Sequence, residues 1–150
     1  MTPRSVLLVA SSGGVLLDLL ALRPWWQRHD TTWIAVRAAD TEIALAGQTV
    51  HWEPELLVAS RLRALPAAFR AVRLLRRVRP EVILSSGGGV AVGVFLAARL
   101  LRIPTVWIET LNQAGPPSGA ARLCARMAGT VVVQRPARAA PGTVLIGELY

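Results

Sequence analysis

The sequence contains no lysine and a single cysteine, and both scarcities narrow what the protein can be. All 17 basic residues are arginine and stand against 9 acidic residues, so the formal net charge is +8. Such an excess attracts phosphate-bearing partners such as nucleic acid, anionic lipid or nucleotide-linked substrates. The lone Cys124 excludes an internal disulfide and a structural zinc site built from cysteines, and its Ala-rich helical setting predicts a small core residue in a reducing compartment.

Long hydrophobic runs are also missing. The apolar run 5–10 is too short for the core of a signal peptide and breaks into Ser-Ser-Gly-Gly. The most apolar later stretch, 90–101, is interrupted by Arg99 and falls short of the ~20 residues that a spanning helix needs. We therefore expect any contact with a membrane to be peripheral.

Common catalytic and cofactor motifs do not occur. The sequence has neither GxGxxG nor a P-loop with its lysine, so it predicts neither dinucleotide nor Walker-type nucleotide binding. His29 and His51 lack metal-ligand spacing and an obvious acidic partner, so no metal or other cofactor is expected. Binding loops without a complete catalytic set favour a protein that works with a partner.

The composition is that of one compact domain. A length of 150 residues, with 53% apolar and 17% charged residues, suits a single buried core. Short β-rich runs alternate with helical patterns, which predicts an α/β, Rossmann-like parallel sheet with helices on both faces. The expected strands are 6–10, 33–37, 49–52, 82–84, 105–108, 130–133 and 144–146, and the expected helices are 15–27, 56–78 with a break near Pro66, 90–101 and 119–127.

Three places directly follow expected strands, where open parallel sheets bind ligands. They contain Ser12, Gly13 and Gly14, then Gly87, Gly88 and Gly89, and then Glu109, Thr110 and Asn112. Glycine before a helix lets backbone N–H groups approach an anion, although tight turns or close helix contacts would use glycine equally well. Glu109 is expected to accept hydrogen bonds from sugar hydroxyls, the alternative being a cap or an ion pair with an arginine.

A basic amphipathic segment lies between Leu56 and Pro80, which encloses seven arginines and no acidic residue. At about 100° per residue, Arg70, Arg73 and Arg77 share one helical face. An anionic membrane surface would attract that face, and the solvated side of an ordinary helix is an equal alternative. Nucleic acid is disfavoured because no aromatic residues are interleaved with these arginines.

Taken in order, the motifs resemble the asparagine-linked glycosylation protein 14-like family. They are Ser12-Gly13-Gly14 with Asp18, the run 80–84 leading into 86–90, Ile108-Glu109-Thr110, and Val133-Gln134-Arg135-Pro136. A more distant similarity, on residues 109–112, runs to the amino-terminal half of the lipid II-forming N-acetylglucosaminyltransferase of peptidoglycan synthesis. Two residues depart from the family pattern, Val15 in place of a histidine and Arg135 in place of an aromatic residue.

The resemblance implies that residues 1–150 are an amino-terminal, acceptor-binding half of a GT-B glycosyltransferase at the cytoplasmic face of the membrane. A separately encoded half would bind the UDP-sugar, and the chain would be inactive without it. Together they would transfer N-acetylglucosamine or a related hexose to a polyprenyl-diphosphate-linked acceptor in exopolysaccharide or lipid-linked oligosaccharide synthesis.

The same resemblance implies roles for particular residues and no metal. Gly13 and Gly14 would approach the acceptor through their backbone, Gly87–Gly89 would shape the groove, and Glu109 would hold or deprotonate an acceptor hydroxyl. A noncatalytic membrane scaffold for a glycosyltransferase is the alternative, which Val15 favours, and a nucleic-acid-binding domain is a weaker one.

Overall fold

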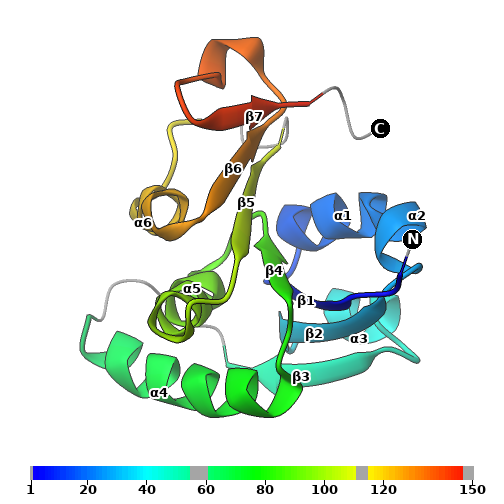
Figure 1. Cartoon of the computed structure of the whole chain (residues 1–150). Coiled ribbons are helices and arrows are strands. Elements are labelled where there is room, and N and C mark those ends of the chain that lie inside the picture. The colour runs from blue at the N-terminus through cyan, green and yellow to red at the C-terminus, as the bar shows by residue number, and fades with distance from the viewer. Residues whose placement is uncertain (1, 55–60, 111–114, 147–150) are drawn as a thin grey trace.

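The chain forms one sheet of seven parallel strands in the order β3-β2-β1-β4-β5-β6-β7 (Figure 1). The structure is a computed structural model that describes residues 2–54, 61–110 and 115–146, and only the backbone of residues 61–64. The strands are β1 (Ser5–Ala10), β2 (Asp30–Val36), β3 (Thr49–Glu53), β4 (Val82–Ser85), β5 (Thr105–Glu109), β6 (Thr130–Val133) and β7 (Thr143–Leu145). The helices are α1 (Gly14–Ala21), α2 (Arg23–Trp26), α3 (Ala39–Ala44), α4 (Arg61–Val78), α5 (Gly89–Leu101), α6 (Gly119–Met127) and the 3-10 helix η1 (Pro136–Arg138).

Helices cover both faces of the sheet, and each face has its own core. On one face Leu7 and Val9 of β1 pack with residues of α4, α5 and α6. On the other face the alternate residues Val6 and Leu8 pack with residues of α1, α2 and α3. Burial on both faces explains why the strands read as continuous apolar runs, as parallel strands do. Each such side chain contributes about 1.5–3 kcal/mol to stability when fully buried.

The α/β Rossmann-like fold expected from the sequence is confirmed, and every expected strand is present with small shifts at its ends. The expected helix 15–27 is divided at Leu22, because Pro24 in the first turn of α2 has no N–H to continue the preceding ladder. The short helix α3 was not expected, since six residues show too little periodicity.

The expected break near Pro66 is wrong, because α4 runs without interruption from Arg61 to Val78. Pro66 lies on the exposed side near the beginning of the helix, where water can satisfy the carbonyl that loses its donor. Of the expected helix 56–78, residues 56–60 lie outside the described part of the chain.

Cys124 of α6 lies in the core beneath α5 and is fully buried, which agrees with the sequence interpretation. Burial raises the pKa of the Cys124 thiol to about 12.

We expect an alkylating reagent to leave Cys124 unlabelled at neutral pH until denaturant unfolds the chain, because the thiolate is the reactive form. Cys124→Ser should cost about 1–3 kcal/mol by burying a hydroxyl. Cys124→Ala serves as the apolar control, and equal labelling of folded and unfolded protein would contradict this burial.

Candidate functional site

The three places that follow strands meet at the carboxyl edge of the sheet, because β1, β4 and β5 are neighbours in that order. The side chain of Ser86, after β4, donates a hydrogen bond to the carbonyl of Val15 in α1 at 3.2 Å. The hydroxyl of Thr110, after β5, donates to Oδ2 of Asp18 in α1 at 2.8 Å. The turns after β1, β4 and β5 therefore form one connected surface.

The turn after β1 is open to solvent. Gly13 has a φ of +73°, and a Cβ built at Gly14 meets no atom within 4 Å. The N–H of Gly13 donates to Oδ2 of Asp40 in α3 at 2.8 Å. The anion that this turn holds in the structure is thus a carboxylate of the chain itself, and a phosphate would have to displace it or bind beside it.

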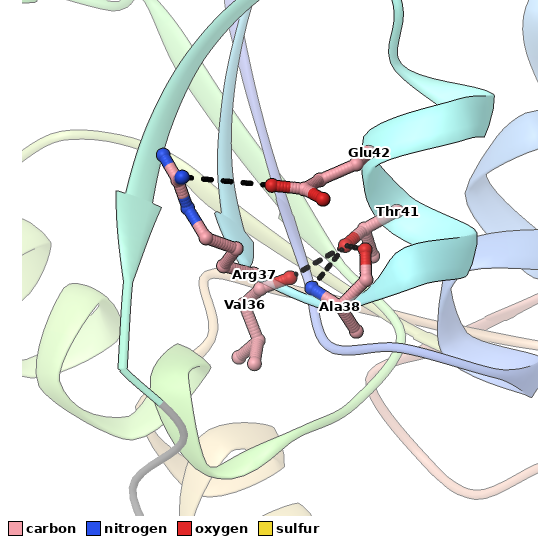
Figure 2. A network of polar contacts seen from close by, with 5 residues as sticks. All are labelled: Val36, Arg37, Ala38, Thr41 and Glu42. Atoms are coloured by element: carbon pink, nitrogen blue, oxygen red, sulfur yellow. Dashed lines mark hydrogen bonds and ion pairs between the residues drawn. The ribbon is translucent and has the colours of Figure 1, made fainter.

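A polar network joins the beginning of α3 to the end of β2 (Figure 2). The hydroxyl of Thr41 accepts from the N–H of Ala38 at 2.9 Å and donates to the carbonyl of Val36 at 2.7 Å. Arg37, which follows β2, forms an ion pair with Glu42 at 3.5 Å. The network holds the first turn of α3 against the end of β2, and Asp40 is consequently directed to Gly13.

The turn after β4 is closed by contact with the turn after β1. A Cβ at Gly87 would lie 2.7 Å from Cγ2 of Val15, and one at Gly88 would lie 2.8 Å from Cβ of Ser11. Gly88 also has a φ of +91°. Close packing therefore explains Gly87 and Gly88, the alternative that the sequence left open. A direct contact of Gly87–Gly89 with a ligand stays a prediction.

Glu109 ends β5 and lies at the same edge. Its side chain is 19% exposed, and its Oε2 lies 3.8 Å from Nη1 of Arg138 in η1. Nη2 of Arg138 donates to the carbonyl of Gly115 at 3.0 Å, so the guanidinium joins η1 to a second loop. Glu109, Thr110, Arg135 and Arg138 line a small cavity of about 10 Å³. The carboxylate thus has an arginine partner and also borders a space at the sheet edge.

Sequence reasoning missed the hydrogen bond between Asp18 and Thr110, both of which are 2% exposed. It noted Asp18 only as part of a motif. A signal was available, because Asp18 is the sole charged residue of the apolar helix α1. Charged residues are almost never fully buried unless paired, so an acid among leucines predicts a buried partner.

The remaining expected residues are the arginines of α4, Asn112 and Ser12. Arg70, Arg73 and Arg77 lie on α4, one of the helices that cover one face of the sheet. Arg70 forms an ion pair with Glu53 of β3 at 3.3 Å. Asn112 lies outside the described residues. Ser12 lies half-buried in the turn after β1.

Two classes of feature are not found in the described part of the chain. It contains no group of three or more His, Cys, Asp or Glu side chains that could hold a metal ion. Within residues 2–54, 61–110 and 115–146, no helix is both long and apolar enough to cross a membrane.

Comparison with curated proteins finds relatives of one kind, although no protein-family model matches the chain. A UDP-N-acetylglucosamine–N-acetylmuramyl-(pentapeptide) pyrophosphoryl-undecaprenol N-acetylglucosamine transferase of Xylella fastidiosa is 41% identical over 90 residues, which are 60% of this chain and 24% of the relative. The transferase of the same name from Roseiflexus sp. is 35% identical over 127 residues, which are 85% of this chain and 25% of the relative. The matched segment thus spans about a quarter of each relative.

Solved structures show the same fold. MurG of Acinetobacter baumannii matches 95% of this chain and 45% of its own with a TM-score of 0.78 at 23% identity. A UDP-N-acetylglucosamine 2-epimerase from Rickettsia bellii matches 99% of this chain and 46% of its own with a TM-score of 0.74 at 11% identity. The chain therefore has the fold of one half of a GT-B protein such as MurG.

These comparisons correct the family expected from the sequence. The resemblance to the asparagine-linked glycosylation protein 14-like family is wrong, because the curated relatives and the matching structure are MurG-type transferases. The more distant of the two similarities was the informative one. The relatives are single chains of which the match covers about a quarter, so they do not support a separately encoded partner half, or exopolysaccharide and lipid-linked oligosaccharide synthesis.

The two glycine turns should respond differently to alanine. Gly88→Ala combines a left-handed φ with a Cβ only 2.8 Å from Ser11, and such strain costs about 1–3 kcal/mol. Gly14→Ala places its Cβ in open space at the beginning of α1 and should leave the free energy of unfolding unchanged or slightly higher. Denaturant unfolding of both variants measures the difference, and equal stabilities would contradict the close contact of the turns.

Proposed function

We propose that this domain, residues 1–150, is the acceptor-binding, amino-terminal-type half of a GT-B glycosyltransferase. Its enzyme would transfer N-acetylglucosamine from UDP-N-acetylglucosamine to a polyprenyl-diphosphate-linked acceptor, as the names of the relatives describe for those proteins. The observation that carries the proposal is the 35% identity over 85% of the chain to such a transferase. The half-GT-B fold and the connected turns at the carboxyl edge of the sheet support it.

The chemistry at this edge needs a group that receives a proton. The acceptor hydroxyl attacks the anomeric carbon of the donor sugar, the bond from that carbon to UDP breaks, and the hydroxyl proton passes to a base. Glu109 is the candidate for that base because its carboxylate borders the cavity at the end of β5. Ser12, Gly13, Gly14, Thr110 and Asn112 are proposed to contact the acceptor, with Gly87–Gly89 shaping the surface beneath it.

The carboxylate of Asp40 bears on which part of the acceptor the glycine turn can bind. Its Oδ2 accepts a hydrogen bond from the N–H of Gly13 at 2.8 Å and places a negative charge beside the turn. A neutral sugar hydroxyl can donate to this carboxylate, whereas a phosphate would be repelled at short range. We therefore assign the turn to a sugar group of the acceptor rather than to its diphosphate.

We expect the 150-residue chain to bind acceptor without transferring sugar, because a GT-B site lies between two halves and this domain has the fold of one. Addition of a nucleotide-sugar-binding half should restore transfer. The measurement is formation of the N-acetylglucosaminylated lipid from labelled donor. Turnover by the 150-residue chain alone would show that the donor also binds within this domain and would refute the assignment.

Glu109→Gln should lower the transfer rate of the completed enzyme by about 10²–10⁴-fold, the contribution of a general base. The melting temperature should change little, since a partly exposed ion pair contributes about 0–1 kcal/mol. Arg138→Gln is the matched control because it breaks the same 3.8 Å contact and keeps the carboxylate. If both variants lose stability alike and keep their activity, Glu109 is a structural ion-pair partner and not a base.

Membrane association is proposed for the exposed side of α4. Leu65 and Phe69 are 72% and 67% exposed. They are one helical turn apart and continue into Arg73 one turn further. Arg70, Arg73 and Arg77 line a shallow hollow with Leu74, and Arg70 also forms an ion pair with Glu53. Apolar residues beside arginines on one helix face fit peripheral binding to an anionic membrane at the cytoplasmic face.

Arg73→Gln combined with Arg77→Gln should weaken binding to vesicles that contain anionic lipid, at about 1 kcal/mol per arginine near the surface. Phe69→Ser should weaken binding as well, with less dependence on salt. Arg28→Gln removes one exposed arginine after α2, which covers the opposite face, and serves as the control. Cosedimentation at several salt concentrations provides the measurement, and equal binding of all variants would remove α4 from the contact.

A further inference from the structure

A buried polar contact ties together two of the proposed acceptor-binding segments. Oδ2 of Asp18 accepts a hydrogen bond of 2.8 Å from the hydroxyl of Thr110, across 92 residues of sequence. Asp18 lies one turn after Gly14 in α1, and Thr110 directly follows Glu109. Because β4 lies between β1 and β5 in the sheet, this bond joins two segments that follow the strands on either side of β4.

Burying this contact costs free energy of desolvation. Both side chains are 2% exposed, and a carboxylate loses most of its hydration at such a position. A hydrogen bond to a charged group is shorter and stronger than one between neutral groups, which offsets part of that cost. An apolar pair would fill the same space without the cost of desolvation. A hydrogen bond differs from apolar packing in that it fixes the relative orientation of the two side chains.

We propose that Asp18 is a positioning residue of the acceptor site. Asp18 fixes the Glu109–Thr110 segment relative to the turn at Gly13 and Gly14. It also binds the hydroxyl proton of Thr110, so that the oxygen of Thr110 is left to accept a hydrogen bond from the acceptor. This inference rests on the proposed function, because the site that it orders is the acceptor site. It adds a residue that the sequence analysis did not place in the site.

The first experiment needs no ligand. Amide hydrogen exchange of the 150-residue chain should quicken at 13–17 and 108–110 in Asp18→Asn and in Thr110→Val, while exchange in β2 and β3 stays unchanged. Thr105→Val is the matched control, because Thr105 is a buried threonine at the other end of β5 that accepts from the N–H of Gly129 at 3.1 Å. Unchanged exchange near Thr110 in both site variants would overturn the proposal.

The second experiment measures affinity for a polyprenyl-diphosphate-linked N-acetylmuramyl-pentapeptide in detergent. Thr110→Val should bind about 10-fold more weakly, which corresponds to about 1.4 kcal/mol. Thr110→Ser keeps the hydroxyl and should restore most of the affinity, and Thr105→Val should bind as the wild type does.

A double-mutant cycle distinguishes positioning from independent contacts. If Asp18 acts through Thr110, the effects of Asp18→Asn and Thr110→Val on affinity will be clearly less than additive. Additive effects, or lower stability with unchanged affinity, would overturn the proposal. Wild-type protein that binds no acceptor would refute the proposed function, and the exchange experiment would still decide whether Asp18 orders these two segments.

Discussion

The parallel sheet imposes the constraint on which the rest of the structure depends. Its central strands, such as β1, are buried on both faces, and because all strands are parallel their carboxyl ends lie at one edge. At that edge the turns after β1 and β4 are in van der Waals contact, and Gly87 and Gly88 leave room only because they have no Cβ. Glycine is required at these two positions for packing. The surface that a ligand would meet is formed by the two packed turns.

Three of the carboxylates at this edge have different environments, which makes different roles possible. Asp18 is buried with a hydroxyl donor, Glu109 is mostly buried with an arginine 3.8 Å away, and exposed Asp40 accepts from a backbone N–H. Glu109 borders the small cavity at the end of β5 and is the side chain proposed as the base. Asp18 is enclosed and is suited to holding protein groups in place.

Part of the positive charge of the chain lies on α4, whereas Arg135 and Arg138 line the cavity beside Glu109. Seven arginines lie between Leu56 and Pro80, and four of them are exposed on α4: Arg70, Arg73, Arg76 and Arg77. A domain of this shape can present one surface to a lipid headgroup layer and another to the polar part of a lipid-linked acceptor. The exposed Leu65 and Phe69 lie on the same helix as these arginines.

The sequence by itself determined the class of fold, the strands and the three segments at the carboxyl edge, because alternation of short apolar runs with helical periodicity reports burial directly. It also located the basic face of α4. Its choice between two related families was wrong, since short glycine motifs are shared by many proteins of this fold. Only the tertiary structure decided the partners Asp40 for Gly13, Arg138 for Glu109 and Asp18 for Thr110. Such contacts join residues far apart in sequence and depend on side-chain direction after packing, which periodicity does not encode.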